Sequence, residues 1–594
     1  MPRYDLVLVH APSVFDFRKK PAVHGPISDV IPPSPYFEMY PIGLISISEH
    51  LTRAGFEVRI VNLAMKMLDD PNFDPEKFLK SLDTRMFGVT LHWLPHVNGA
   101  LAVSELLKKL HPKTPVMMGG FSASFFHEEL IREYPAVDFV MRGDSTEKPM
   151  VDFMEAVACG REDFSSIDNL TWRGKDGEPV VNPLNYRPSD LSEVFTNYEH
   201  AIRQSIRHLD ITGYQPFQTW KKYPITAVFT CRGCIHNCKT CGGGTHYFSE
   251  TMKRPTPAFK PPKLVARDMK VAETFINAPI FIIGDVMQLG EEYALELFAE
   301  IKRLKIRNEV AIEFFAPVPR KVVAAMADAM PKFNIEISPE SHDEEVRYAF
   351  GRPFDNKSLE EFIADAEEFG CRRFDIFFMT GLPKQTSKNV LETVDYCETL
   401  MKRFGSRRML RPFISPLAPF VDPGSAVWQH PDRYGYKLFY TKLSELRAAL
   451  DMPSWKYFLN YETEWMTRDE IVYTTYEAGM KLNEVKARLG YLSESDAKVV
   501  KERNQRAVAL MHEIDKALAI ADPVERERAL ALVRPKIRDV DESTLCDKKE
   551  LDWPTGLLLL QYHKVAPVVI SAFLNRIFNP PRAKKMDREC WKSQ

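Results

Sequence analysis

The stretch that decides the fold spans residues 230–244 and reads TCRGCIHNCKTCGGG. Four of the chain's nine cysteines lie in it, at Cys231, Cys234, Cys238 and Cys241. A structural zinc site usually takes two CxxC pairs about 15 residues apart, whereas these pairs are separated by residues 235–237 only. A redox dithiol needs one CxxC, and bacterial ferredoxins use a different spacing. The interpretation that remains uses the C-x3-C-x2-C triad of Cys234, Cys238 and Cys241 on a four-iron cube.

Three thiolates on such a cube leave its fourth iron without a protein ligand. An open coordination position on a metal is a catalytic feature, because a substrate or cosubstrate can bind there. Residues 242–244 are glycines, whose bare backbone can approach the cluster or its ligand closely. We expect Cys231, which lies outside the triad, to be a small buried residue.

The motif opens the second of two series of alternating strands and helices. Six apolar strand patterns begin after Tyr223, and helical patterns such as 263–277, 320–330, 359–370 and 387–404 separate them. These strands are 225–230, 279–285, 310–316, 333–341, 374–383 and 411–419. Six units fall short of an eight-unit barrel and predict a partial (β/α)6 barrel over residues 223–430. Because chemistry in such folds collects at the carboxyl ends of the strands, the cysteine loop lies where an active site forms.

The first series occupies residues 1–160. Its strand patterns are 4–12, 57–64, 86–94, 115–123 and 137–144, and helical patterns follow at 41–55, 74–82, 98–112, 128–135 and 148–160. The nearly continuous apolar strands are typical of parallel strands buried on both faces. Five βα units in sequence predict an open, doubly wound, Rossmann-like sheet of the α/β class.

The remaining segments are less regular. Residues 161–222 predict a linker between the two α/β domains, with a hairpin at 169–183 that turns at Lys175-Asp176-Gly177. Residues 431–594 follow a helical, charged pattern and predict a C-terminal helical domain.

Composition narrows the functional class. The chain has 79 basic and 81 acidic residues, a net charge of −2, which argues against general binding of nucleic acid. The amino terminus enters a strand pattern without a secretory signal, and the clustered cysteines indicate a metal site in a reducing cytoplasm.

One apolar stretch, residues 554–578, is interrupted by His563, Lys564 and Pro567. The uninterrupted runs are shorter than the ~18 residues that a membrane helix needs. The favoured interpretation is a buried pair of short helices. The alternative is a surface that contacts a lipid substrate or the face of a membrane.

The cysteine triad directly after the first strand of a six-strand α/β unit resembles the radical S-adenosylmethionine (SAM) superfamily. The resemblance implies a [4Fe-4S] cluster on the triad, SAM chelated to the open iron, and a ferredoxin- or flavodoxin-type electron donor. One electron would cleave SAM to a 5′-deoxyadenosyl radical. Further strand-end positions resemble the family's SAM contacts. They are Gly284, Asp285, Ser338, Glu340, Ser341, Arg352, Gly381 and Pro383. The family motifs usually have a glutamate at the position of Asp285 and a glycine at that of Lys384.

The first domain resembles the cobalamin-binding domain that precedes the barrel in one large subfamily. The matching positions, candidates for cobalamin contact, are Pro41, Gly43, Leu44, His92, Gly119, Gly120, Arg142 and Gly143. The D-x-H-x-x-G motif that supplies a cobalt-ligating histidine is absent, and His10 and His24 lie outside such a context. The alternative is a degenerate domain that serves as a scaffold. His92 and Trp93 are either cofactor contacts or ordinary packing residues.

These features predict a cobalamin-dependent radical SAM enzyme. It would functionalise an unactivated carbon of a small molecule or lipid, most simply by methylation. A second hypothesis keeps the radical but forms rings, couples carbons or rearranges an apolar substrate without methyl transfer. A third is a non-enzymatic cobalamin or cluster sensor. The tail shows no compact basic recognition pattern of the kind that a DNA-binding sensor would carry.

Overall fold

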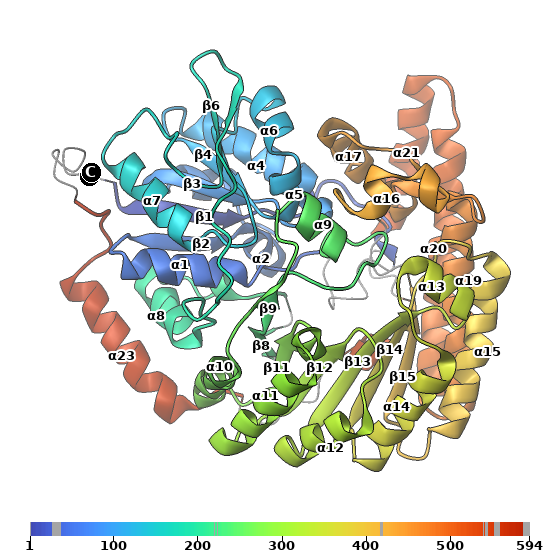
Figure 1. Cartoon of the computed structure of the whole chain (residues 1–594). Helices are drawn as coiled ribbons and strands as arrows, with labels where there is room; N and C mark the ends of the chain where they lie inside the picture. Colours follow the sequence, from blue (N-terminus) through green and yellow to red (C-terminus); the bar gives the residue numbers. More distant parts are fainter. Residues whose placement is uncertain are drawn as a thin grey trace.

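The fold contains two parallel sheets with their helices, followed by a mainly helical tail (Figure 1). The computed structural model describes residues 2–25, 37–218, 220–222, 224–415, 420–538, 540, 545–551 and 559–585. Within these ranges, none of the helices has the length and apolar character to cross a bilayer. The predicted α/β class, with an open sheet followed by a partial barrel, is confirmed.

The first sheet has seven strands in the order β2-β1-β3-β4-β5-β6-β7. The first five run parallel, as the sequence predicts. They are β1 (Tyr4–His10), β2 (Val58–Asn62), β3 (Thr84–Thr90), β4 (Val116–Gly119) and β5 (Phe139–Met141). Parallel pairing directs all five carboxyl ends to one edge of the sheet, which is where ligands bind in open α/β folds.

Helices cover both faces of this sheet. Leu6 and Leu8 of β1 pack in one apolar cluster with α1 (Gly43–Arg53) and α7 (Glu147–Ala158). Val7 and Val9 point to the opposite face, where α4 (Val97–Leu110) and α6 (His127–Glu133) pack. Successive residues of the strand therefore enter different cores, which explains the continuous apolar run in the sequence. Shorter helices in the same region are α2 (Leu63–Asp69), α3 (Pro75–Lys80), η2 (Leu94–His96) and α5 (Phe121–Phe125).

The segment between the two α/β units is structured. The hairpin of β6 (Leu170–Arg173) and β7 (Pro179–Val181) pairs antiparallel with β5 and extends the first sheet at its edge. Next come α8 (Tyr198–His208) and η3 (Thr212–Tyr214), which lie against α1 and β2. The predicted linker region thus contributes strands and a helix to the first domain.

The second sheet has six parallel strands in the order β15-β14-β13-β12-β11-β8, the partial barrel that the sequence predicts. They are β8 (Thr226–Phe229), β11 (Ile280–Ile283), β12 (Val310–Phe314), β13 (Phe333–Glu340), β14 (Arg373–Phe378) and β15 (Leu410–Ile414). Residues 416–419 of the last predicted strand lie outside the described ranges. The helices are α10 (Pro262–Phe275), α11 (Glu291–Leu304), α12 (Arg320–Ala329), α13 (Glu344–Phe350), α14 (Asn356–Glu368) and α15 (Ser387–Arg403), with α9 (Thr245–Glu250) and η4 (Val286–Leu289) near the cysteine loop.

The tail contains a small sheet as well as the predicted helices. β16 (Tyr436–Leu438) pairs antiparallel with β17 (Tyr461–Thr463), a pairing that the helical pattern did not indicate. The longest helix pair is α19 (Arg468–Arg488), which packs on α15 and β15, and α20 (Glu494–Leu518). The others are α16 (Ala426–Gln429), η5 (Asp432–Tyr434), α17 (Leu443–Leu450), α18 (Trp455–Phe458), α21 (Pro523–Ile537), α22 (Lys548–Leu551) and α23 (Tyr562–Phe578).

The prediction of a buried helix pair over 554–578 is wrong. Residues 554–558 lie outside the described ranges, and the rest forms one helix, α23, that continues through Pro567 and packs on α8 (Figure 1). Val568 and Ala572 are buried, whereas Phe573 and Ile577 are 48% and 56% exposed. The helix has one apolar face against the protein and a second apolar face toward solvent. The sequence is therefore apolar along most of the helix although only one of these faces is buried.

A buried ion pair joins the first domain to the barrel. Arg232, in the two-residue strand β9 (Cys231–Arg232), which pairs with β10 (Ala258–Phe259), donates to both carboxylate oxygens of Glu147 at 2.9 and 2.5 Å. The Ser46 hydroxyl also donates to Glu147, at 2.9 Å. Burial alone would raise the pKa of Glu147, but the charge and hydrogen bonds of Arg232 lower it to about 2.

We expect Glu147→Gln to weaken the contact between the two domains, because it leaves the Arg232 guanidinium buried without its counter-charge. Removing one partner of a buried pair typically costs about 3–5 kcal/mol. Since the folded-state pKa lies below the ordinary value of 4.5, the stabilisation is complete above about pH 5 and is lost as the pH falls toward 2. Urea unfolding measured between pH 3 and pH 7 checks both effects.

The matched control on the same helix is Asp152→Asn, which removes an exposed ion pair with Lys148. Exposed pairs contribute less than about 1 kcal/mol, so this variant should resemble the wild type. Equal stability of Glu147→Gln and Asp152→Asn would show that the Arg232 contact does not hold the domains together.

Candidate active site

The cysteine loop follows β8 and is fixed against the far side of the barrel mouth. Cys238 packs on Phe350 of α13 and on Leu382, which follows β14, with Cys241 beside it. The Lys239 N–H donates to the Phe350 carbonyl oxygen at 3.0 Å. The three thiols therefore face a wall made by the later strand-end loops of the same sheet.

Gly351 makes this close approach possible. It adopts a φ of +110°, and a Cβ atom at this position would lie 2.3 Å from the carbonyl oxygen of Asn237 in the cysteine loop. Any side chain would push the loop away from α13. The glycine of the FGRPF segment is thus required by backbone packing against the metal-binding loop.

Asp422 holds the last turn of the loop. Its Oδ2 accepts the Gly242 N–H at 2.8 Å, and its own N–H donates to the Thr240 carbonyl oxygen at 3.1 Å. Burial raises the pKa of Asp422 to about 6. Sequence analysis missed this residue, because nothing in the local pattern connects position 422 with the cysteines.

The donor set suits a cluster. Burial raises the pKa of Cys234 to about 12, and burial followed by the neighbouring Cys238 thiol and Asp422 raises that of Cys241 well above its ordinary value. The three thiols are close enough to perturb one another, and the Gly243 N–H donates to Cys241 Sγ at 3.2 Å. Such thiols would stay protonated without a metal, and iron binding would deprotonate them.

Cys231 lies outside the triad, although its thiol is close enough to contribute to the raised pKa of Cys234. It is half-buried, and the Gln288 amide approaches its Sγ at 3.7 Å. Burial raises its pKa to about 11. The side chain packs next to Gly284, where an added Cβ would lie 2.9 Å from Cys231 Sγ.

Seven of the eight positions predicted to contact SAM lie at the carboxyl ends of the strands or in the loops that follow them, whereas Arg352 follows α13. Asp285 begins η4, where its Oδ1 accepts the Met287 N–H at 2.8 Å and its Oδ2 accepts the Phe315 N–H at 3.1 Å. His236 of the cysteine loop approaches Oδ2 at 3.5 Å. Both oxygens of Asp285 therefore already accept backbone N–H groups at the mouth of the barrel. His236 is a neighbour that the sequence did not indicate.

Glu340 and Arg352 form a buried pair beside the cysteines. Arg352 donates to Glu340 Oε1 at 3.3 Å and to the Phe315 carbonyl oxygen at 3.0 Å, and its charge acts on Cys238. Glu340 Oε2 and Arg352 Nε have no hydrogen-bond partner among the described residues. Burial raises the pKa of Glu340 to about 7 although Arg352 opposes it. These orphaned polar atoms fit a polar cosubstrate at the cluster.

The loop after β14 is organised by Gln385. Its Oε1 accepts the N–H groups of Gly381 and Leu382 at 2.8 and 3.2 Å. Lys384, where the family has glycine, adopts a φ of +65°, a left-handed conformation that glycine adopts without strain. Pro383 lies in this turn. The two predicted serines are buried: Ser338 lies within β13, and Ser341, which follows the strand, accepts the Asp343 N–H through Oγ at 3.1 Å.

A cavity of about 830 Å³ lies between the first domain and the barrel. From the first domain it is lined by the predicted residues Pro41, Gly43, Leu44, His92, Gly119, Gly120 and Gly143, together with Trp93. Arg142 is an exception, since its guanidinium donates to the Asn182 carbonyl oxygen behind this wall. Gly120 has a φ of +120°, and a Cβ there would lie 2.6 Å from His92 Cα, so the turn requires glycine. The bare backbone of Gly119 leaves open space for a flat cofactor.

The other walls come from segments that the sequence did not assign to the site. Barrel residues Arg232, Phe281, Ile283 and Glu336 line the cavity, so it reaches the barrel interior. Its side wall comes from α8, the loop after it, and the inner face of α23. These residues are Tyr198, Ile202, Ile206, Phe217, Trp220, Val565 and Val569. The helical spacing of Tyr198, Ile202 and Ile206 was the available signal for an apolar face.

Carboxyl groups occupy the barrel interior. Glu313 of β12 and Glu336 of β13 are register partners, and Asp375 of β14 follows at the same level. Burial raises the pKa of Glu313 to about 7, and burial together with Asp375 raises that of Glu336 to about 8. A mostly apolar cavity thus ends at protonatable groups in the barrel.

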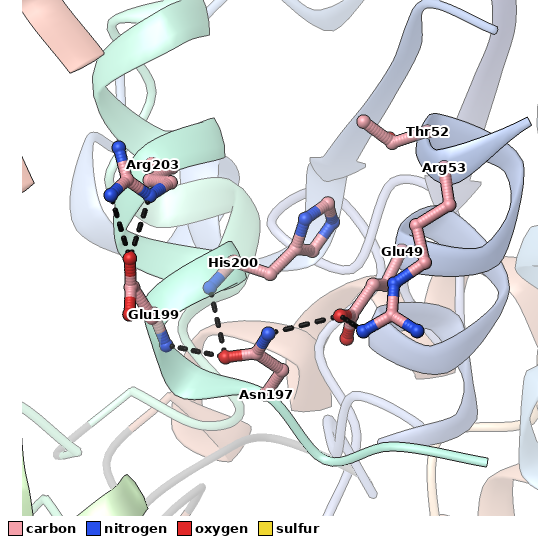
Figure 2. A pocket seen from close by; sticks show the side chains of 7 residues that line it. All are labelled: Glu49, Thr52, Arg53, Asn197, Glu199, His200 and Arg203. Atoms are coloured by element: carbon pink, nitrogen blue, oxygen red, sulfur yellow. Dashed lines mark hydrogen bonds and ion pairs between the residues drawn. The ribbon is translucent and has the colours of Figure 1, made fainter. Parts of the chain in front are cut away.

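A second, smaller hollow between α1 and α8 is not a comparable site (Figure 2). Its polar groups satisfy one another: Asn197 Nδ2 donates to Glu49 Oε1 at 2.9 Å, Arg53 pairs with Glu49, and Arg203 pairs with Glu199. This network fastens α8 to the first domain.

Comparison with known families identifies both domains. The family described as B12 binding domain matches residues 30–150, and the Radical SAM superfamily matches residues 228–397. The cofactors of the chain are therefore a [4Fe-4S] cluster, SAM and cobalamin, and the chain is an enzyme. This outcome disfavours the sensor hypothesis.

Two curated relatives are similar in sequence. One is the uncharacterized methyltransferase PH0819 of Pyrococcus horikoshii, 21% identical over 401 residues, which are 66% of this chain and 78% of the relative. The other is the hopanoid C-3 methylase of Methylococcus capsulatus, 23% identical over 288 residues, 47% of this chain and 48% of the relative. The match thus spans about half the length of that methylase.

Solved structures share the fold. The radical SAM methyltransferase TsrM of Kitasatospora setae, with cobalamin and a [4Fe-4S] cluster bound, superposes with a TM-score of 0.53 at 16% identity over 74% of this chain and 81% of its own. The cobalamin-dependent radical SAM enzyme OxsB superposes with a TM-score of 0.51 at 12% identity over 96% and 84%. At these identities the likeness establishes the fold.

We expect the alanine variants of Cys234, Cys238 and Cys241 each to lose nearly all cluster iron and sulfide, because each removes one of three ligands. Cys231→Ala is the matched control from the same loop and should retain both. The cluster content of each variant is measured by iron and sulfide analysis and by the cluster absorbance after anaerobic reconstitution. Loss of the cluster in Cys231→Ala to the same extent would contradict the assignment of the triad.

Proposed function

We propose that this chain, a member of the radical SAM superfamily with an amino-terminal B12 binding domain, transfers a methyl group from SAM to an unactivated carbon of its substrate. The observation that carries the proposal is the single cavity lined by both domains. A methyl donor held at the edge of the first sheet and a radical generated at the barrel mouth would act on one molecule bound between them.

In such a reaction the cluster and SAM supply a hydrogen-abstracting radical, and cobalamin relays a methyl group from a second SAM. For each C–H bond converted to C–CH3, two SAM molecules and two electrons are consumed. The products are S-adenosylhomocysteine, methionine and 5′-deoxyadenosine, which carries the abstracted hydrogen. The electrons come from an external ferredoxin- or flavodoxin-type donor, and we place the enzyme in the cytoplasm with its reducing thiol environment.

Residues at different positions of the site would bind the cluster, SAM and cobalamin. Cys234, Cys238 and Cys241 would hold the cluster, and the unpartnered atoms of Glu340 and Arg352 would bind the polar groups of SAM beside it. Gly284 and Gly381 keep the strand-end backbone bare. In the first domain, Gly119, Gly120 and Gly143 would let cobalamin lie against the backbone. The aromatic walls exclude water from the space between the two cofactors.

Two relatives that match the larger shares of this chain have names that support methyl transfer: PH0819 is called a methyltransferase, and the Methylococcus capsulatus relative is called a methylase. A third relative, 22% identical over 32% of this chain, is called an anaerobic magnesium-protoporphyrin IX monomethyl ester cyclase, a name that fits the second hypothesis. The second hypothesis, ring formation or carbon–carbon coupling on an apolar substrate, predicts consumption of SAM without S-adenosylhomocysteine.

The test supplies SAM with a trideuterated methyl group to the full chain loaded with cluster and cobalamin. The substrate source is a metabolite extract from a strain of the source organism that lacks the gene. We expect a labelled product together with S-adenosylhomocysteine, both dependent on cobalamin. Formation of 5′-deoxyadenosine alone would refute methyl transfer and favour the second hypothesis.

The variant Gly119→Leu tests whether cobalamin binds at the edge of the first sheet. A Cβ at Gly119 meets its nearest atom, the Met141 carbonyl oxygen, at 3.5 Å, which is ordinary contact, so the side chain can enter the cavity without backbone strain. We expect cobalamin affinity to fall by about tenfold or more, equivalent to about 1.4 kcal/mol, while the cluster content stays unchanged. Gly119→Ala is the matched control with too small a side chain to fill the space.

We further propose that the substrate is lipid-like and that α23 contacts a membrane surface. The support is the outward face of α23, where apolar side chains are about half exposed or more. They are Ile570, Phe573, Leu574, Ile577 and Phe578. The inner face of the same helix lines the cavity through Val565 and Val569, so an apolar molecule could pass from the surface into the cavity beside it.

We expect the double variant Phe573→Ser and Ile577→Ser to reduce co-sedimentation with vesicles of phosphatidylcholine and phosphatidylglycerol several-fold. Leu532→Ser on α21 is the control, because Leu532 is 76% exposed and lies on another helix. If the wild type does not sediment with vesicles, or if both variants behave alike, α23 is not a membrane contact.

A further inference from the structure

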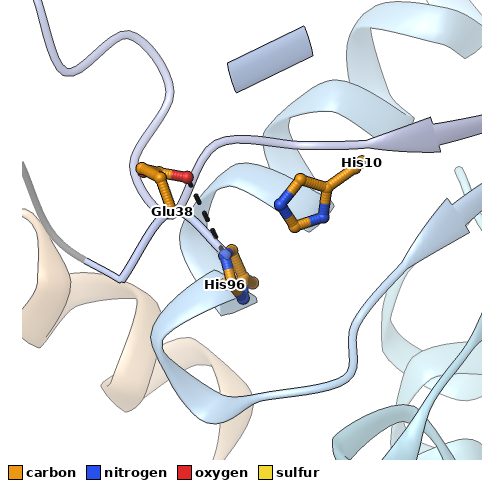
Figure 3. A group of neighbouring side chains, drawn as sticks. All are labelled: His10, Glu38 and His96. Atoms are coloured by element: carbon orange, nitrogen blue, oxygen red, sulfur yellow. Dashed lines mark ion pairs between the residues drawn. The ribbon is translucent and has the colours of Figure 1, made fainter. Parts of the chain in front are cut away.

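Three side chains from separate segments of the first domain meet in its interior (Figure 3). His10 ends β1, Glu38 precedes α1, and His96 ends η2 at the start of α4. Their exposed fractions are 1%, 0% and 2%. One nitrogen or oxygen of each lies within 4.8 Å of the others. Two imidazoles and one carboxylate buried together form a set that needs a chemical explanation.

Hydrogen bonds on the outer side of the cluster orient two of the three groups. His10 Nδ1 lies 3.1 Å from Thr90 Oγ1, and the Ser13 N–H donates to Glu38 Oε1 at 2.8 Å. When Nδ1 carries the proton and donates it to Thr90, the lone pair of His10 is on Nε2. Metal-binding histidines are oriented in this way, by a hydrogen bond from the ring nitrogen that does not bind the metal.

The inner nitrogens of the two histidines lack such partners. His10 Nε2 and His96 Nε2 have no hydrogen-bond partner among the described residues, and Glu38 Oε2 lies 3.8 Å from His96 Nε2 (Figure 3). Leaving buried polar nitrogens unpaired costs about 1–3 kcal/mol each.

We propose that His10, Glu38 and His96 bind a structural Zn²⁺ ion. Two imidazoles and a carboxylate are zinc ligands, whereas Mg²⁺ and Ca²⁺ select oxygen-rich sites. Tetrahedral ligands at about 2.0–2.1 Å from zinc lie about 3.3 Å apart, so the three side chains must close inward as the ion binds. A water molecule completes the fourth position.

The site connects directly to the large cavity. The His10 ring contacts Tyr40 with a centroid distance of 6.1 Å, and the His96 ring contacts Trp93 at 5.9 Å. Tyr40, Trp93 and Thr90 all line the cavity, as do Met39, Pro41 and Ile42 after Glu38. The ion would therefore clamp the segment that carries residues 39–42 to the edge of the first sheet. This role is independent of the reaction proposed above and of the cysteine cluster.

The test is zinc analysis of the full chain, purified anaerobically with its iron–sulfur cluster from zinc-supplemented cells. We expect close to one zinc per chain in the wild type and a loss of most of it in His10→Asn and His96→Asn. Asparagine can replace the Nδ1 hydrogen bond but cannot reach the position of Nε2. His208→Gln is the matched control, a buried histidine of the same domain whose Nε2 lies 3.0 Å from the Val58 carbonyl oxygen and 3.7 Å from Glu57 Oε1.

Two further measurements distinguish this site from zinc held by the cysteines. Zinc should persist when Cys234, Cys238 and Cys241 are all replaced by alanine, and X-ray absorption at the zinc edge should show nitrogen and oxygen ligands without sulfur at about 2.3 Å. Wild-type protein without zinc, zinc that disappears with the cysteines, or iron in place of zinc would each overturn the proposal. So would unchanged zinc in both histidine variants.

Discussion

Parallel strand pairing is the constraint on which the rest of this molecule depends. In a parallel sheet every strand ends at the same edge, so the loops that follow the strands meet there whatever their separation in sequence. In the first domain this brings His92, Gly119 and Gly143 together, and in the barrel it brings the cysteine loop to Glu340 and Gly381. Both large sheets are arranged in this way. The ion pair between Glu147 and Arg232 joins the first domain to the barrel beside the cavity that they share.

Local pattern was sufficient for the two large sheets but not for the pairing of β16 with β17, and resemblance to known families supplied the cofactors. Continuous apolar strands followed by helical periodicity predicted both sheets, and the spacing of Cys234, Cys238 and Cys241 predicted the chemistry. The local sequence pattern could not predict contacts between segments that are distant in the sequence. Asp422 lies 180 residues from Gly242, to which it bonds, and no local signal connects the two. The apolar run ending at Phe578 was misjudged for a related reason, because periodicity cannot tell a face packed on protein from a face left in solvent.

The cavity combines two chemical environments. Methionine, isoleucine and aromatic side chains form most of its wall, yet it reaches Glu336 on the strand that also carries Glu340. Register pairing aligns Glu313, Glu336 and Asp375 across three neighbouring strands. Burial, with the nearby Asp375, raises the pKa of Glu336, whereas Asp375 itself pairs with Arg373. A largely apolar molecule with one hydrogen-bonding end would match both environments, because its polar group could bond to Glu336 while its body stays among the hydrocarbon side chains.

The wall contributed by α23 has a consequence for biosynthesis. Val565 and Val569 of α23, together with Leu551 and Leu560, enclose a space otherwise built from residues between Leu8 and Glu336. While the ribosome is still translating the barrel, α23 cannot cover that side of the cavity. The wall closes there only after Val569 has been translated, so the cofactor edge of the first domain stays open on that side throughout translation of the barrel.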